Sequence, residues 1–362
     1  MKCRVCREPA VIDIRRHNAN FCADHFLRLC RDQVTKAIDA FSMIAPGERC
    51  LVAVSGGKDS LAVWDILLDL GYEADGLYLG LGIGDYSDES AGYARAFAAS
   101  RDAELIEISI PDTYGFDIPN GSRAAKRKPC SACGLSKRHL FDQAAIEGRY
   151  DVVATGHNLD DEAAVLFGNV LHWQTEYLGR QLPVLPARDG FPRKVKPLVR
   201  LGEREMAAYC VLRGIDYIVD ECPMAKGNKH LGYKEALNAI EATSAGAKHS
   251  FYFGFLDRAS ARFQEEAAAD QADLTPCTRC GSPTSTEVCA FCRLVDRAGG
   301  HLPAGDHDTR LDAWFGDHLH PDPVLDDAVG PDDLDRTDDD AIVDLAPVHL
   351  APTRRPPKDV RA

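Results

Sequence analysis

The sequence predicts an α/β fold with a doubly wound, mostly parallel sheet, flanked by N- and C-terminal zinc fingers and followed by a disordered acidic tail. Between residues 47 and 266, apolar runs alternate with helical patterns, and paired cysteine motifs lie on either side of this region. Such alternation is typical of parallel sheets, in which ligands bind at the carboxyl ends of the strands. The expected segments are 1–30 for the first zinc finger, 31–270 for the α/β domain, 271–297 for the second zinc finger and 298–362 for the tail.

Two sets of paired metal ligands predict the zinc fingers. Each set consists of two ligand pairs with two residues inside each pair, which suits a tetrahedral zinc ion, and bound zinc stabilises a segment that is too short for a core of its own. The N-terminal set is Cys3, Cys6, Cys22 and His25, and the C-terminal set is Cys277, Cys280, Cys289 and Cys292. We therefore expect two Zn²⁺ per chain. The alternative, cysteines buried as small apolar residues, would have to produce these pairings by chance.

The stretch LVAVSGGKDSLAVW, which begins at Leu51, predicts a phosphate-binding turn between a strand and a helix. Its first four residues are an apolar run typical of buried strands, and from Asp59 onward the apolar spacing is helical. Gly56 and Gly57 permit positive φ angles and close backbone approach, and the helix start offers unpaired N–H groups to an anion. The loop differs from the Walker loop because Asp59 separates Lys58 from the following serine. The alternative is an ordinary glycine-rich turn. We expect the helix to bury Leu61, Trp64, Ile66 and Leu67.

The remaining elements follow from the same patterns. Further strands are expected at 74–81, 105–110, 151–155 and 215–219, and helices at 88–100, 133–147 and 251–266. The loops that follow strands, where we expect the chemistry, are 55–60, 82–87, 111–129 and 156–161.

A second group of reactive residues lies in KPCSACGLSKR, where Cys130 and Cys133 stand at the start of a predicted helix beside basic residues. Helix N-termini and cations stabilise thiolates, which are both nucleophiles and metal ligands. Cys222 in DECPM supplies a third thiol. Three converging thiols could bind zinc with a fourth ligand, form a persulfide and disulfide relay, or hold a [4Fe–4S] cluster with one open iron. The lack of an obvious fourth partner favours an open site, but the residues alone do not separate relay from cluster.

The stretch TGHNLDDEAA follows the expected strand at 151–155. Gly156 permits close approach to a ligand, and Asp160 and Asp161 stand at a helix start, where carboxylates are favourable and could hold magnesium. The alternative is a plain helix cap. Because this loop and the phosphate loop share the carboxyl edge of one sheet, a functional role is favoured.

The charge distribution indicates which partners the chain could bind, and the cysteine content indicates its cellular compartment. The net charge is −14, but residues 301–362 hold 15 Asp and 6 Lys or Arg, so residues 1–300 carry only −5 and keep basic clusters that could contact RNA. These clusters are Arg15-Arg16, 126–128, Lys137-Arg138 and 193–196. The sequence shows no apolar leader and no 18-residue apolar span, so we expect no membrane segment. Together with this, the 13 cysteines indicate a reducing cytoplasm. The cysteines that match no motif, and are expected in the core, are Cys30, Cys50 and Cys210.

These motifs in this order resemble the tRNA 2-thiolation enzymes of the TtuA type, within the TtcA/TtuA family of PP-loop ATP pyrophosphatases. The matching pieces are both zinc motifs, SGGKDS, GIGDYS, PCSACGLSKR, TGHNLDDEAA and ECP, which run from Cys3 to Cys292. The resemblance implies a transferase that adenylates a uridine O2 with Mg-ATP, releases pyrophosphate and replaces the oxygen with sulfur. The expected target is (5-methyl)uridine 54 of tRNA. Alternatives are the wobble uridine 34, another PP-loop tRNA-modifying ligase without the cluster, or a zinc-dependent RNA-binding module with a degenerate nucleotide domain.

Carried over position by position, the resemblance implies roles for single residues. It implies an oxygen-sensitive [4Fe–4S] cluster on Cys130, Cys133 and Cys222, and therefore favours the cluster over zinc and over a persulfide relay. It implies that the catalytic residues are Lys137, Asp161, Cys130 and Cys222. ATP is implied to bind at Ala53, Ser55, Gly57, Lys58, Asp59, Ser60, Leu79, Lys137 and Gly156. The implied partners are tRNA, a ubiquitin-like sulfur carrier with a C-terminal thiocarboxylate, and a second copy of the chain in a homodimer; the acidic tail is not part of the family pattern.

Overall fold

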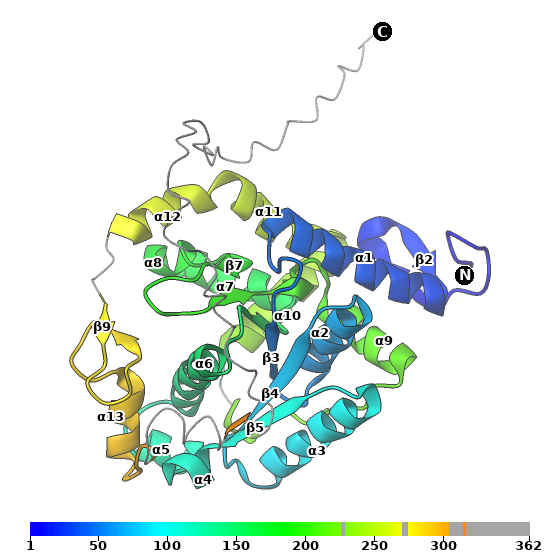
Figure 1. Ribbon diagram of the computed structural model, residues 1–362. Helices are drawn as coiled ribbons and strands as arrows, with labels where there is room; N and C mark the ends of the chain where they lie inside the picture. Colours follow the sequence, from blue (N-terminus) through cyan, green and yellow to red (C-terminus); the bar gives the residue numbers. More distant parts are fainter. Residues whose placement is uncertain (226–228, 270–273, 304–313, 316–362) are drawn as a thin grey trace, which may run out of the picture. The chain divides into compact units, whose positions relative to one another are not determined.

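A six-stranded sheet forms the centre of the computed structural model, which describes residues 1–225, 229–269, 274–303, 314 and 315 (Figure 1). The spatial order is β5-β4-β3-β6-β8-β7; the first five of these strands pair in parallel, and β7 pairs antiparallel with β8. The strands are β3 (Cys50–Val54), β4 (Ala74–Gly80), β5 (Leu105–Ser109), β6 (Val152–Thr155), β7 (Val184–Leu185) and β8 (Arg193–Val195). Since β4 and β6 lie on opposite sides of β3, the chain reverses its direction of winding there, which is where doubly wound sheets open a ligand crevice.

Strand side chains alternate between two hydrophobic cores, one on each face of the sheet. Val52 points into the core that contains α2 (Lys58–Asp69) and α9 (Glu203–Arg213). The next residue towards the N-terminus, Leu51, points into the core that contains α6 (Pro129–Glu147). This alternation follows from the two-residue period of a strand. Helices therefore cover both faces, and the predicted doubly wound fold class is confirmed.

The other elements flank this sheet. The N-terminal part contains β1 (Ile12–Ile14), η1 (Arg15–His17), β2 (Ala19–Phe21) and α1 (Ala23–Phe41). The middle part contains α3 (Gly84–Arg101), α4 (Ile110–Tyr114), α5 (Ile118–Ala124), α7 (Leu159–Leu171), α8 (Thr175–Leu178), η2 (Pro197–Arg200) and η3 (Pro223–Ala225). The C-terminal part contains α10 (Lys229–Thr243), α11 (Ala247–Arg258), α12 (Ser260–Ala269), β9 (Thr275–Pro276), β10 (Pro283–Thr284) and α13 (Ala290–Arg297).

Four of the expected strands are confirmed to within two residues, but the strand expected at 215–219 is wrong. This segment is irregular: Ile215 and Ile218 are buried, whereas Val219 is 80% exposed. The N–H of Ile218 donates to the carbonyl of Gly56 at 3.0 Å. The apolar residues therefore pack beside the phosphate loop instead of pairing in the sheet.

The single helix expected at 251–266 is also wrong, because α11 and α12 are separate helices. Ala259 follows α11 with a φ of −131°, which lies outside helical geometry. The chain therefore changes direction between the two helices.

The basic cluster at 193–196 forms part of the sheet. Lys194 Nζ lies 2.6 Å from a carboxylate oxygen of Asp142. Lys196 Nζ lies 2.7 Å from a carboxylate oxygen of Glu162. These internal ion pairs remove both lysines from the basic surface that was expected to contact RNA.

The chain that follows α13 begins as part of the core. The N–H of His301 donates to the carbonyl of Tyr114 at 3.0 Å. Trp314 and Phe315 are buried, and the ring of Phe315 lies 6.5 Å from that of Tyr150. The rest of the expected acidic tail, 304–313 and 316–362, lies outside the described residues. Among the helices that the structure describes, none has the length and apolar character needed to cross a membrane.

Asp65, in the middle of α2, ties this helix to its neighbours. Its side chain is fully buried and lies 2.7 Å from Arg213 Nε, and the hydroxyl of Tyr209 donates to it at 2.6 Å. Arg101, at the end of α3, also pairs with it. Burial alone would raise the pKa of Asp65, but Arg213, Tyr209 and Arg101 together lower it below its usual range. Asp65 is therefore ionised inside the core.

We expect Asp65→Ala to lower the free energy of unfolding by about 3–5 kcal/mol, because two arginines would lose a buried partner. Since the folded-state pKa is depressed, this contribution is complete at neutral pH and is lost only as the pH falls below about 4. Urea unfolding at pH 7 and in acid measures both effects. Asp32→Ala is the control, because Asp32 is 55% exposed and 4.0 Å from Arg28, so its loss should cost less than about 1 kcal/mol. Equal effects of the two changes would contradict the prediction.

Candidate functional site

The phosphate loop joins β3 directly to α2. The hydroxyl of Ser60 donates to the carbonyl of Gly57 at 2.9 Å and accepts from the N–H of Ser55 at 3.1 Å, which closes the turn. Gly57 is the N-cap of α2 and offers no side chain to the first N–H groups. These donors therefore remain available to an anion.

Only the first of the two loop glycines uses the left-handed region. Gly56 has a φ of +70°, and a Cβ at this position would lie 2.2 Å from the carbonyl oxygen of Ser90. Gly57 has a φ of −90°. Gly56, which was not in the implied ATP-binding set, is thus the position where the loop requires glycine.

The backbone after β6 lies directly against the start of α2. A Cβ on Gly156 would lie 2.8 Å from the carbonyl carbon of Asp59 and from the nitrogen of Ser60. Gly156 therefore permits close approach to the protein backbone. Next to it, Asn158 caps α7 and donates from Nδ2 to Asp59 Oδ1 at 3.1 Å.

A cavity of about 940 Å³ opens beside this loop. Lys58 and Asp59 line it from the phosphate loop, and Cys222 lines it from the segment before η3. Arg15 and Arg16 of η1 also line it, so the N-terminal segment contributes to the same space. The cavity therefore brings together the phosphate loop and one of the three expected thiols.

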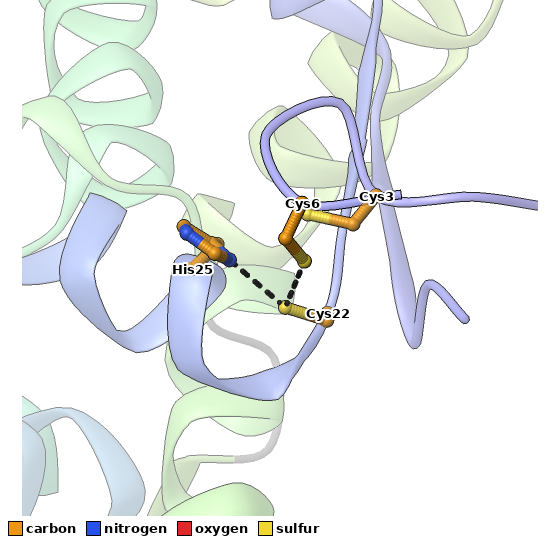
Figure 2. Close-up of side chains that lie close together, drawn as sticks. All are labelled: Cys3, Cys6, Cys22 and His25. Carbon is orange, nitrogen blue, oxygen red and sulfur yellow. Dashed lines mark hydrogen bonds between the residues drawn. The ribbon is translucent and has the colours of Figure 1, made fainter. Parts of the chain in front are cut away.

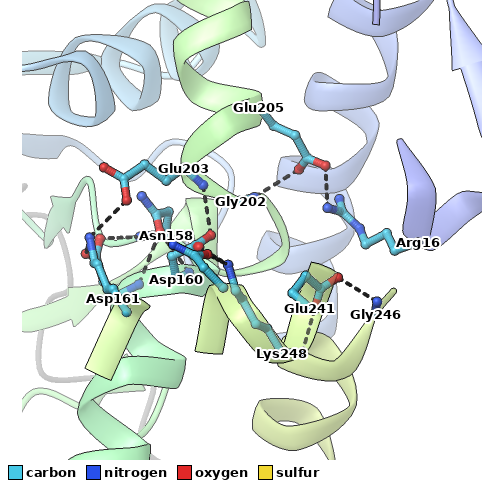
Figure 3. A network of polar contacts seen from close by, with 12 residues as sticks. Arg16, Asn158, Asp160, Asp161, Gly202, Glu203, Glu205, Glu241, Gly246 and Lys248 are labelled. Carbon is cyan, nitrogen blue, oxygen red and sulfur yellow. Dashed lines mark hydrogen bonds and ion pairs between the residues drawn. The ribbon is translucent and has the colours of Figure 1, made fainter. Parts of the chain in front are cut away.

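Four charged side chains form a chain at one side of the loop, and two of them, Glu203 and Asp161, are labelled in the polar network of Figure 3. Lys58 Nζ lies 2.8 Å from Glu203 Oε1. The other oxygen of Glu203 lies 3.2 Å from Lys234 Nζ, which in turn lies 2.6 Å from Asp161 Oδ1. The alternating charges link the phosphate loop to the start of α7.

Burial and charge act in opposite directions on these groups. Burial alone would lower the pKa of Lys58, but Asp59 and Glu203 raise it above its usual value. Burial would also lower the pKa of Lys234, but Asp161 and Glu203 raise it. Burial raises the pKa of Asp59; Lys58 opposes this rise and Asp161 adds to it. Both lysines therefore stay charged at neutral pH beside three carboxylates, those of Asp59, Glu203 and Asp161.

The three expected thiols come from two neighbouring segments. Cys130 and Cys133 lie at the start of α6, and Cys130 Sγ is 3.5 Å from the carbonyl of Met224, two residues after Cys222. Burial raises the pKa of Cys133; Lys137 opposes the rise, whereas Cys222 and Cys130 add to it. Lys137 therefore stabilises the thiolate of Cys133, as the sequence predicts, but burial and the two neighbouring thiols outweigh this effect and raise the pKa.

These thiols do not form a set for one ion. Among the described residues, the sets whose ligand atoms all lie within 4.8 Å of one another are the two expected zinc sets, and Cys130, Cys133 and Cys222 are not among them. Thiolates on one tetrahedral zinc lie about 3.8 Å apart. The arrangement therefore disfavours the zinc reading for this site.

The two expected zinc sets share one design. Figure 2 shows the first set, in which Cys22 Sγ lies 3.7 Å from Cys6 Sγ and 3.1 Å from His25 Nδ1. Cys22 is the N-cap of α1, and His25 lies three residues later in that helix. In the second set Cys289 is the N-cap of α13, with the next ligand again three residues later. Each set can hold one metal ion, with a helix N-terminus directed at a thiolate.

Some residues of the implied site lie away from the cavity. Ala53 and Leu79 lie within the sheet, and Leu79 is buried. Lys137 lies on α6, one turn after Cys133. Neither these three residues nor Asp161 belongs to the described lining of the cavity.

Three polar residues at this site, Asn158, Glu203 and Lys234, were not predicted from the sequence. Asn158 carried a signal, because an asparagine followed by acidic residues is typical of a helix N-cap. Glu203 and Lys234 carried none, because their partners lie 31 to 145 residues away in the chain. Only the fold brings these groups together.

The parallel sheet and the SGGKDS turn at its carboxyl edge define an α/β protein of the PP-loop class. A family model described as "2-thiouridine synthetase TtuA, N-terminal LIM domain" matches residues 2–27. The chain is 50% identical to the tRNA-5-methyluridine(54) 2-sulfurtransferase of Thermus thermophilus over 82% of this chain and 91% of that protein. It is 40% identical to the protein of the same name from Pyrococcus horikoshii, over 81% and 93%. The chain belongs to the tRNA-5-methyluridine(54) 2-sulfurtransferase family.

A solved structure supports the fold. The U34-tRNA thiolase NcsA from Methanococcus maripaludis, solved with its [4Fe-4S] cluster, superposes with a TM-score of 0.67. The two sequences are 23% identical, and the match covers 82% of this chain and 96% of that one. The shared architecture extends through most of the described residues.

We expect Gly56→Ala to abolish ATP binding and to destabilise the protein, because the new methyl group would collide with the carbonyl of Ser90. Gly47→Ala is a matched control: Gly47 has a similar φ of +80°, but nothing lies within 4 Å of its added Cβ. The control should lose only about 1 kcal/mol through backbone strain and keep ATP binding. Thermal unfolding and equilibrium binding of ATP measure both. Equal behaviour of the two variants would show that the contact with Ser90 is unimportant.

Proposed function

We propose that the chain is a tRNA 2-sulfurtransferase that thiolates the (5-methyl)uridine at position 54 of tRNA in an ATP-dependent reaction. The cavity carries this proposal, because one space of about 940 Å³ contains both the phosphate loop and Cys222. Relatives at 50% and 40% identity are named for position 54, whereas the neighbour named for U34 is 23% identical. The closer similarity favours position 54 over the wobble position.

The phosphate loop would bind ATP at the start of α2. Backbone N–H groups and the ammonium of Lys58 would hold the phosphates, and the carboxylates of Asp59 and Asp161 would hold Mg²⁺, which relieves their mutual repulsion. The uridine O2 would attack the α-phosphorus, and the bond from this phosphorus to the bridging oxygen would break, releasing pyrophosphate. Adenylation turns the uridine oxygen into a leaving group.

Cys130, Cys133 and Cys222 would hold a [4Fe–4S] cluster. A cluster of four irons separates its cysteine ligands, so it accommodates thiols that are too far apart for one ion, and three cysteines leave one iron without a protein ligand. Bound there, the cluster would supply a site that carries sulfide from the donor; the sulfur takes the place of the adenylated oxygen, which leaves with AMP. Cys222 borders the cavity, so this sulfur would enter the space that receives the uridine.

Two zinc ions would stabilise the terminal segments. Each four-ligand set has the spacing that one tetrahedral ion requires. The N-terminal set lies beside η1, whose arginines line the cavity. Zinc would thereby fix one wall of the site.

The remaining partners rest on the family resemblance. We propose a ubiquitin-like carrier with a C-terminal thiocarboxylate as the sulfur donor, and a homodimer as the assembly. None of the 13 cysteines forms a disulfide, which supports a reducing, cytoplasmic compartment.

Replacement of Lys58 or Asp59 tests the nucleotide site. We expect Lys58→Ala and Asp59→Ala each to lower tRNA-dependent pyrophosphate release by about 100-fold or more, because charge stabilisation at the reacting phosphates is lost. Mass spectrometry of the tRNA nucleosides would show no new 2-thiouridine, and mapping the wild-type product would place it at position 54. Normal thiolation by Asp59→Ala would overturn the PP-loop assignment, and wild-type product at position 34 would overturn the target.

Metal analysis of protein purified without oxygen tests the thiol site and the zinc sets together. We expect iron and about two zinc ions per chain, with broad visible absorption that bleaches in air. Serine at any of Cys130, Cys133 or Cys222 should remove iron and thiolation but keep zinc, because a hard oxygen replaces a soft ligand. Cys6→Ser is the matched control and should remove one of the two zinc ions but no iron. Full activity in iron-free protein would contradict the cluster and would favour the alternative in which these cysteines carry a persulfide.

A further inference from the structure

We propose that Lys234 of α10 is a positioning residue for the thiolation reaction: it holds the carboxylates of Asp161 and Glu203 in place beside the phosphate loop. This inference rests on the proposed function and extends it to a residue outside the implied site.

Close packing brings α10 against α7. A Cβ on Gly168 would lie 2.6 Å from the ring of Tyr233, so the ring fills the space that a side chain would occupy. Asp161 precedes Gly168 by two helical turns and therefore lies on the same face of α7. Lys234 follows Tyr233 on α10, and its long side chain reaches Asp161.

The ammonium of Lys234 joins two carboxylates that come from different helices. It lies 2.6 Å from Asp161 Oδ1 on α7 and 3.2 Å from Glu203 Oε2 on α9. The side chain is 21% exposed, and Asp161 is 25% exposed. These pairs are therefore partly shielded from solvent, unlike surface ion pairs, which contribute little.

Glu203 connects Lys234 to the phosphate loop. Its second oxygen lies 2.8 Å from Lys58 Nζ, and its N–H donates to Asp160 Oδ2 at 2.9 Å. Without Lys234, Glu203 would keep one cation instead of two. The carboxylate of Asp161, near Asp59, would keep only the N–H of Asn158 as a partner among the described residues. Through Glu203, Lys234 thus links Lys58, which would contact the phosphates, to Asp161, which would hold magnesium.

Lys234 acts through these neighbours. Among the described residues, Lys58 and Glu203 line the cavity but Lys234 does not. Its removal should therefore disturb the alignment of the reacting groups more than the binding of ATP.

The test compares three variants of the anaerobically purified holoprotein by pyrophosphate release with ATP and tRNA. We expect Lys234→Ala to lower kcat by about 10- to 100-fold, as for other residues that orient metal ligands, with KM for ATP changed less than about threefold. Lys234→Arg should recover most of kcat, because it keeps the charge. Lys229→Ala is the matched control, since Lys229 is an exposed lysine on the same helix, and it should behave as wild type.

A second measurement separates positioning from a general effect on the fold. In the Asp161→Asn, Glu203→Gln background, Lys234→Ala should cost less than about twofold more, because its partners are already neutral. A kcat within about twofold of wild type for Lys234→Ala, an undiminished effect in that background, or failure of arginine to recover activity in a protein with unchanged thermal stability would each overturn the inference. Absence of thiolation by the wild type would overturn the proposed function, and this inference with it.

Discussion

The backbone at Gly156 lies so close to the first turn of α2 that no side chain fits between them. On the other side of the same loop, Gly56 meets the carbonyl of Ser90 with equally little room. These two contacts fix the phosphate loop between the segments that follow β4 and β6. Since donors must be preorganised to stabilise developing charge, this backbone packing is what the chemistry of the site depends on.

A chain of ion pairs beside the phosphate loop adds to these backbone contacts. Lys58 reaches Glu203, and Lys234 connects Glu203 with Asp161. The helices that supply these groups are held by their own contacts, such as the buried carboxylate of Asp65 between α2 and α9. In this partly buried chain of alternating charges, each carboxylate offsets the cost of burying a neighbouring ammonium.

The three-thiol group and the two terminal four-ligand sets differ in the spacing of their ligand atoms. Both terminal sets place their ligand atoms within 4.8 Å of one another. Cys130, Cys133 and Cys222 come from α6 and the segment before η3, and their sulfur atoms do not all lie within that distance. One ion suits the first arrangement, and a cluster with several irons suits the second.

The sequence by itself determined the elements whose signal is local. Strand β3, helix α2 and both four-ligand sets follow from apolar spacing, turn residues and ligand pairs that lie within a few tens of residues, and each is found where it was expected. Tertiary structure decided the features that depend on distant partners. Residues 215–219 look like a strand because they are apolar, yet they pack beside Gly56, and the basic run at 193–196 is engaged by internal carboxylates. Lys234 gave no signal, because its role depends on side chains of α7 and α9, and a single sequence does not record which helices meet.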